Sequence, residues 1–228
     1  MSKKTILSYR YRLYPTKEQK ELLQANLDAC RWLYNYSLEQ LGEGRDIARA
    51  YGWSSFRGIP SQYDLSAQLP WLKQRFPFLQ KVNAKVLQRV LAQLYSNLRV
   101  LSSLKKNGRK IGKLRFKGKN RSRTLNFNQS GFKLKGKKLY LHKIGEVNIK
   151  YHRDIAGKIK GILVKRENSG KWFAIMQVEK PVESHEATVE KAVGIDVGVN
   201  PFLTDTDGKK MENPEYYDKT VKRLKILH

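Results

Sequence analysis

Cysteine and long apolar runs are the first things that this 228-residue sequence lacks. Its single cysteine, Cys30, excludes an intrachain disulfide and a zinc site built from cysteine pairs. No run approaches the roughly 20 apolar residues of a membrane-spanning helix, and the N-terminus has no apolar secretion signal. We therefore expect a cytoplasmic protein with no membrane partner and no zinc, in which Cys30 is a small core residue.

Compact catalytic motifs are also missing. The sequence contains neither a GxxxxGK[ST] phosphate loop nor a GxSxG nucleophile elbow. Its four histidines have no metal-ligand spacing with each other or with Cys30. P-loop enzymes, α/β-hydrolases and compact zinc enzymes are therefore disfavoured. The histidines are His142, His152, His185 and His228.

Acidic residues are scarce relative to basic ones. Lys and Arg number 46 against 20 Asp and Glu, which gives a formal net charge of +26. Residues 105–166 contain 21 basic residues and only two acids, Glu146 and Asp154, a net charge of +19. This excess predicts a polyanionic partner. Nucleic acid fits better than a membrane surface, because the charges do not line one amphipathic helix.

The densest basic stretch, residues 105–123, has ten basic residues and no acid. Such a run is often only a solvated surface, but self-repulsion at this density favours an anionic partner. Gly112 and Gly118 allow the backbone to approach a phosphate chain closely. Contacts of this kind position a nucleic-acid backbone and do not read its sequence. The candidate binding residues are Lys105, Lys106, Arg109, Lys110, Lys113, Arg115, Lys117, Lys119, Arg121 and Arg123.

Arg10 and Arg12 are two further candidates for nucleic-acid binding. Residues 5–14 alternate with period two, which predicts a half-buried strand with both arginines on its outer face. The arginines either pair with phosphates, with Tyr14 as a stacking surface, or face solvent, and both interpretations stay open. The inner face would hold Thr5, Leu7, Tyr9, Tyr11 and Leu13.

Helical periodicity begins after this strand. Thr16-x-x-Gln19 is a capping-box signature, and the apolar stripe that follows it extends to Leu41. The glycines of residues 42–60 then predict a loop.

Two more helices are predicted beyond that loop. A short one covers about residues 61–72, and a long one follows Pro77, with leucines spaced alternately four and three residues apart. Asn107-Gly108 supplies the stop signal of the long helix.

Alternation with period two returns in residues 113–179, where short runs are separated by glycine and asparagine turns. Because helices separate these runs from the first strand, we predict an α+β fold with an antiparallel barrel or sandwich interrupted by a helical insert. Residues 179–191 resemble a linker. The predicted strands are Thr124–Asn128, Lys138–Leu141, Val147–Lys150, Lys158–Arg166 and Lys171–Glu179.

Asp196 is the one candidate catalytic residue. It lies in an apolar run flanked by Gly194 and Gly198, and a second strand-like run and a turn at Asp207-Gly208 follow. In ribonuclease-H-like sheets such an aspartate holds Mg²⁺, whereas in the actin and sugar-kinase superfamily a similar hairpin approaches ATP phosphates. A solvent-facing aspartate at a strand end is the third interpretation. The basic residues before Asp196 favour the nuclease type.

Several stretches resemble the N-terminal half to two-thirds of the TnpB family, the OrfB-type transposases of insertion sequences, which are RNA-guided DNA endonucleases related to type V CRISPR effectors. They follow the family's order along the whole chain. The stretches are 11–19 (YRLYPTKEQ), 30–35 (CRWLYN), 114–117 (LRFK), 144–147 (IGEV), 157–160 (GKIK), 169–173 (SGKWF), and the hairpin around Asp196 followed by 212–214 (ENP).

This resemblance implies three regions. Residues 1–14 and 109–183 would form a discontinuous wedge-like β-barrel, residues 15–108 a helical recognition insert, and residues 184–228 a linker and the incomplete start of a RuvC domain. It also implies a guide RNA and, through it, target DNA as partners in a prokaryotic cytosol or nucleoid. Asp196 matches the first metal-binding aspartate of RuvC.

The sequence departs from the family in its last region. The later RuvC Glu and Asp and the Cys-x-x-Cys pairs do not occur, and residues 216–227 read as the start of a charged helix. We therefore expect a truncated protein that binds guide RNA and does not cleave alone, with Mg²⁺ bound only if residues outside this chain, supplied in trans for example, complete the site. The alternative is an RNA-independent DNA-binding regulator or transposition accessory protein.

Overall fold

The computed structural model describes residues 4–50, 59–181 and 192–227. The chain divides into two compact units, residues 1–182 and 183–228, which are described separately. Most of the linker predicted at residues 179–191 lies outside the described residues. None of the described helices is long and apolar enough to cross a membrane.

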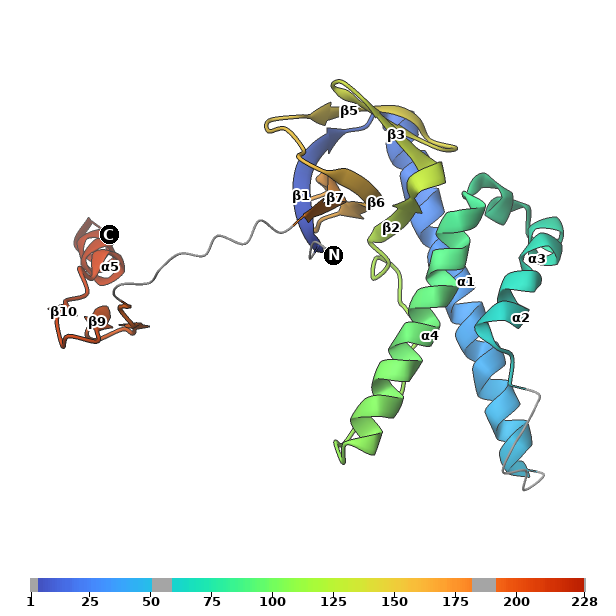
Figure 1. Ribbon diagram of the computed structural model, residues 1–228, viewed down its shortest axis with the longest axis horizontal. Helices are drawn as coiled ribbons and strands as arrows, with labels where there is room; N and C mark the ends of the chain where they lie inside the picture. The colour runs from blue at the N-terminus through green and yellow to red at the C-terminus, as the bar shows by residue number, and fades with distance from the viewer. Residues whose placement is uncertain (1–3, 51–58, 182–191, 228) are drawn as a thin grey trace. The chain divides into compact units, whose positions relative to one another are not determined.

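An antiparallel sheet of seven strands forms the base of the first unit, in the order β2-β6-β7-β1-β5-β4-β3. Its two edge strands, β2 and β3, are consecutive in sequence and joined by the 3-10 turn η2 (Gln129–Gly131), so the sheet curls into a nearly closed barrel (Figure 1). The strands are β1 (Lys4–Tyr14), β2 (Thr124–Asn128), β3 (Phe132–Lys135), β4 (Lys138–Leu141), β5 (Gly145–Lys150), β6 (Lys158–Arg166) and β7 (Trp172–Pro181).

The predicted barrel is therefore confirmed, and three of its strands have the predicted bounds. The strand β3 was not predicted, and it directly follows the 3-10 turn that ends at Gly131. The inner face of β1 is only partly as predicted. Tyr11 and Leu13 are fully buried, whereas Leu7 is 40% exposed.

Between β1 and β2 the described residues form five helical segments. They are α1 (Lys17–Ala50), α2 (Gln62–Ala67), α3 (Leu69–Arg75), η1 (Pro77–Lys81) and α4 (Ala84–Lys106). Figure 1 shows the two long helices, α1 and α4, projecting away from the barrel. The leucines predicted on one face of the last helix are confirmed as its packing face, with Leu87, Leu91 and Leu94 fully buried.

The loop predicted over residues 42–60 is wrong for its first part, since α1 continues through Gly42 to Ala50. A glycine inside a helix costs about 1 kcal/mol relative to alanine. Here that cost is offset by packing, because Leu41 is buried in a cluster with Tyr34 and Leu94. Residues 51–58 lie outside the described part.

The single helix predicted over residues 61–72 is also wrong, because two short helices meet at Gln68. Gln68 is both the C-cap of α2 and the N-cap of α3, and Pro70 occupies the first turn of α3. A proline is tolerated there and not in a continuous helix interior.

The capping box predicted at Thr16 is confirmed, and it ties α1 to the barrel. The Thr16 backbone N–H donates to Gln19 Oε1 (3.1 Å), and the Gln19 N–H donates to Thr16 Oγ1 (3.3 Å). The Gln19 Nε2 also donates to the carbonyl oxygen of Glu146 on β5 (2.8 Å). This one side chain therefore fixes the start of the helix to a strand 127 residues away.

The second unit is small and open. It contains the antiparallel strands β8 (Ile195–Val197), β9 (Leu203–Asp205) and β10 (Lys210–Met211), followed by α5 (Tyr216–Leu227). The hairpin around Asp196 and the charged helix are thus where the sequence predicted them. All three side chains of β8 are exposed in this unit.

The two ammonium groups beside Glu179 make the stability of the barrel depend on pH. Hydrogen bonds from Lys160 (2.8 Å) and Lys4 (2.9 Å) lower the pKa of Glu179 from 4.5 to about 2. A carboxylate with a lowered pKa stabilises the fold above its unfolded pKa, and this contribution is lost as the pH falls towards the folded value. Glu179→Gln should therefore lower the denaturant midpoint at pH 6, and its difference from the wild type should vanish near pH 2. Identical pH profiles of the two proteins would contradict this.

Candidate nucleic-acid interface

The dense basic stretch consists of the end of α4 and an extended segment, residues 109–123, which we call the basic strap. The predicted stop signal is confirmed, because Asn107 is the C-cap of α4 and Gly108 has a φ of +72°. The chain then returns towards β2 in an extended conformation. A segment without strand pairing needs other contacts to hold it in place.

Asn35 on α1 supplies the main polar contact of the strap. Its Oδ1 accepts from the Lys117 backbone N–H (2.8 Å), and its Nδ2 donates to the Lys117 carbonyl oxygen (3.1 Å). Three residues earlier, Leu114 packs against the cluster of Tyr34, Leu41 and Leu94. These contacts fasten the strap to both long helices.

Lys117 differs from the other candidates because it is half-buried. Its ammonium lies 4.0 Å from the ring centroid of Tyr34, a cation–π contact. Burial lowers the pKa of Lys117, and burial raises the pKa of the nearby Cys30 thiol to about 12. Cys30 is 3% exposed, so its predicted place in the core is confirmed. Lys117 therefore has a packing role, and its contact with phosphate stays a prediction.

The other candidates in residues 105–123 are all exposed. In the part of the chain that the structure describes, none of them forms an ion pair with a carboxylate. These exposed cations therefore have no carboxylate partner among the described residues. These residues are Lys105, Lys106, Arg109, Lys110, Lys113, Arg115, Lys119, Arg121 and Arg123.

Arg10 and Arg12 lie on the outer face of the barrel as predicted, but they have partners that the sequence did not indicate. The Arg10 guanidinium stacks 3.8 Å from the centroid of Phe173, and its Nη2 lies 2.6 Å from Glu167 Oε1. Arg12 lies 5.1 Å from Phe173 and 5.6 Å from the Tyr14 ring. The strand pairing of β1 with β7 brings these groups together. Only knowledge of that register would have revealed Phe173.

Asp196 is exposed in the middle of β8, opposite Thr204 of β9. Asp205, the last residue of β9, accepts hydrogen bonds through Oδ1 from the N–H groups of Asp207 (3.0 Å) and Lys209 (2.8 Å), at the predicted turn of Asp207-Gly208. Among the described residues no group of three or more His, Cys, Asp or Glu side chains could hold a metal ion. Asp196 is therefore not part of such a group in the described part of the chain.

A comparison with protein families shows which class of protein the start of the chain resembles. Residues 1–44 match the helix-turn-helix domain family HTH_OrfB_IS605. In the structure the described residues of this match form β1 and the first part of one continuous helix, α1. The predicted resemblance is confirmed: the chain is related to the OrfB-type, or TnpB, proteins.

Particular relatives match nearly the whole chain. A "Putative RNA-guided DNA endonuclease" of Streptomyces pristinaespiralis is 27% identical over 95% of this chain and 52% of its own length. A second relative, the "Putative RNA-guided DNA endonuclease InsQ" of Escherichia coli K12, is 22% identical over 98% of this chain and 53% of its own length. The chain thus spans about half the length of these relatives.

Among solved structures, one match is a chain in the cryo-EM structure of the Cas12f1-sgRNA-target DNA complex. It is 14% identical, with a TM-score of 0.47, and the alignment covers 93% of this chain and 54% of that one.

The anchoring of the strap can be tested by removing the Asn35 amide. Asn35→Ala should leave the Lys117 N–H without its acceptor, which loosens the strap by about 1 kcal/mol. Hydrogen exchange of residues 113–119 should then be about fivefold faster, as followed by mass spectrometry. Gln93→Ala is the matched control, because that exposed amide bonds only Asn97 on its own helix. Equal exchange in both variants would contradict the proposed anchor.

Proposed function

We propose that this chain is the RNA-binding part of a TnpB-type protein and that it contacts RNA through the exposed cations of residues 105–123. The observation that carries the proposal is the group of exposed basic side chains at the end of α4 and along the strap, none of which pairs with a carboxylate among the described residues. Phosphates neutralise such charges and release counterions, which provides binding free energy independent of sequence.

The relatives support RNA as the ligand, since both are named RNA-guided DNA endonucleases. In such systems base pairing with the guide supplies sequence recognition, and the protein contacts the backbone and the shape of the RNA. We propose that DNA is bound in the same way, by pairing with a guide RNA held on this chain. Because the chain spans about half of each relative, guided cleavage is a proposal for a longer assembly.

Asp196 is proposed as one Mg²⁺ ligand of that assembly. In-line hydrolysis of a phosphodiester with two metals needs several carboxylates, and the described residues place no second one in a metal-binding group with Asp196. The further ligands would come from residues outside this sequence, in the same polypeptide or in trans. No catalytic step is therefore assigned to the residues described here.

The salt dependence of RNA binding tests the strap. Replacing Lys113, Arg115, Lys119 and Arg121 by Gln should make the negative slope of log K against log salt shallower by about 3, if each residue neutralises one phosphate of single-stranded RNA. Fluorescence anisotropy of a labelled transcript at several salt concentrations would measure the slope.

The matched control removes the same charge from α5, by replacing Lys219, Lys222, Arg223 and Lys225 with Gln. An equal loss of slope in both variants would show that net charge, and not the strap, sets the affinity. RNase-insensitive retention of duplex DNA by the wild-type chain would instead favour the RNA-independent regulator.

A nuclease assay tests the assignment of Asp196. We expect the purified chain with Mg²⁺ and bound RNA to leave a target DNA intact, and we expect Asp196→Ala to bind RNA as tightly as the wild type. Cleavage by the chain alone that Asp196→Ala abolishes would refute the need for outside carboxylates. Asp154→Ala, an exposed acid in the first unit, is the control for charge.

A further inference from the structure

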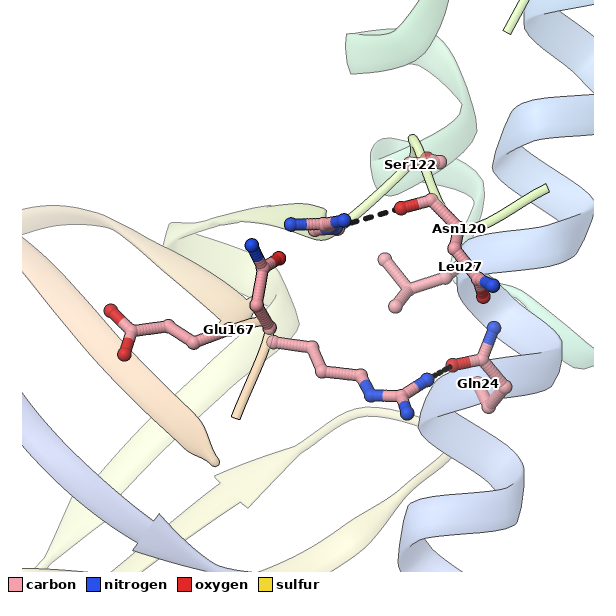
Figure 2. Close-up of a pocket in the computed structure, with 8 residues that line it drawn as sticks. Gln24, Leu27, Asn120, Ser122 and Glu167 are labelled. Carbon is pink, nitrogen blue, oxygen red and sulfur yellow. Dashed lines mark hydrogen bonds between the residues drawn. The ribbon is translucent and has the colours of Figure 1, made fainter. Parts of the chain in front are cut away.

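A polar hollow of about 220 Å³ lies between α1, the end of the basic strap and the turn that follows β6. Figure 2 shows Gln24 and Leu27 entering it from α1, and Asn120 and Ser122 from the strap. It is smaller than the 300 Å³ or more that drug-sized ligands typically occupy. The hollow therefore suits a compact group. Its lining residues are Gln24, Leu27, Asn120, Ser122, Arg123, Arg166, Glu167 and Asn168.

Two arginines line this hollow at the ends of neighbouring strands. One position beyond the last paired residues of β2 and β6, the Arg166 N–H donates to the Arg123 carbonyl oxygen (2.9 Å), so the two residues stand directly opposite. Opposite residues of an antiparallel pair project to the same face, and like charges there repel. An anion between the guanidinium groups would convert this repulsion into attraction.

Each guanidinium is held in place by a neutral oxygen. Arg166 Nη1 donates to Gln24 Oε1 (2.5 Å), and Arg123 Nε donates to the Asn120 carbonyl oxygen (2.7 Å). Gln24 is oriented in turn, because its Nε2 donates to Asp28 Oδ2 (3.0 Å). A guanidinium has five N–H donors, so these anchors orient both groups and leave other donors for a ligand.

The one carboxylate that lines the hollow is turned away from it. Glu167 Oε1 bonds Arg10 Nη2 at 2.6 Å, and Figure 2 shows the Glu167 side chain extending away from the other labelled residues. Arg10 is itself stacked on Phe173. Arg10 therefore withdraws the negative charge that would otherwise neutralise Arg166 or Arg123.

We propose that this hollow binds one backbone phosphate of the RNA, with Arg123 and Arg166 as a pair of guanidinium forks and Arg10 as the residue that keeps Glu167 out of the site. The inference rests on the proposed function and adds a specific phosphate site to it. Guanidinium groups match phosphate oxygens bidentately, which a point-like ammonium does not. The amides of Asn120 and Asn168 and the Ser122 hydroxyl border the same space.

Binding of a labelled single-stranded RNA to the full chain tests the two forks. Arg123→Gln with Arg166→Gln should weaken binding by about tenfold more than the control pair does, because charge-assisted hydrogen bonds are lost as well as charge. Lys133→Gln with Lys135→Gln is the control, since both lysines are exposed on β3 and the charge change is equal. Equal losses in the two variants would overturn the site and leave the proposed function standing.

A measurement without mutation guards against misfolded variants. In the wild-type chain, the ¹⁵N-detected Nε signals of Arg123 and Arg166 should shift saturably with inorganic phosphate and with the RNA. Unmoved signals would overturn the site. An RNA that does not bind the wild type at all would overturn the proposed function together with the RNA assignment. Binding of DNA with the same sequence is measured in parallel. If the arginine double variant loses affinity for DNA only, the site binds DNA and not RNA.

A double mutant separates the two roles open to Arg10. If Arg10 acts by holding Glu167, Arg10→Gln weakens RNA binding and Arg10→Gln with Glu167→Gln restores it. If the double variant binds as weakly as the single one, Arg10 itself contacts RNA, and its assigned role in the hollow is wrong.

Discussion

The fold depends on the two-sided pairing of β1. This strand is the first in sequence but lies inside the sheet, between β7 and β5, with Tyr9 opposite Met176 and Leu13 opposite Ile149. Both edges of β1 pair with strands that come more than a hundred residues later in the sequence. The helices between β1 and β2 form from local contacts, whereas the barrel closes only through distant ones. Loop-closure entropy makes such pairing the slow, cooperative part of folding.

The position of the basic strap follows from this constraint. The chain that leaves the barrel through α1 must return to β2, and residues 109–123 make that return along the helices. Leu114 and Lys117 of the strap pack against residues of the long helices, whereas its other candidate cations are exposed to solvent. A return path that needed strand pairing or a buried face would have had no room for so much charge. The strap is therefore a connection whose exposed charge we propose as a binding surface.

Local patterns made much of the fold predictable. The period-two runs gave β2, β4 and β6, and the leucine spacing gave α4, because these patterns report which side chains face the core. The errors arose where packing outweighed local preference. Gly42 lies inside a helix because its neighbour Leu41 is buried, and β3 is held by pairing with β4 although its own sequence is short.

The candidate site was less predictable than the fold. Sequence marked the cations but not their surroundings, because Glu167, Phe173 and Gln24 reach the arginines only through strand register and helix packing. The same holds for Lys117, whose place over Tyr34 distinguishes it from its neighbours. Charge density is a property of composition, whereas the pairing of each charge is a property of tertiary structure.

The burial of Cys30 has a practical consequence. The chain has no other cysteine, and a thiol that is 3% exposed with a pKa raised to about 12 is almost wholly protonated and shielded at neutral pH. Since the thiolate is the nucleophile, a maleimide dye will spare Cys30 in the folded protein. A cysteine introduced on the strap or on α5 would then be the only one to react. The native chain is thus ready for site-specific labelling at a position of choice.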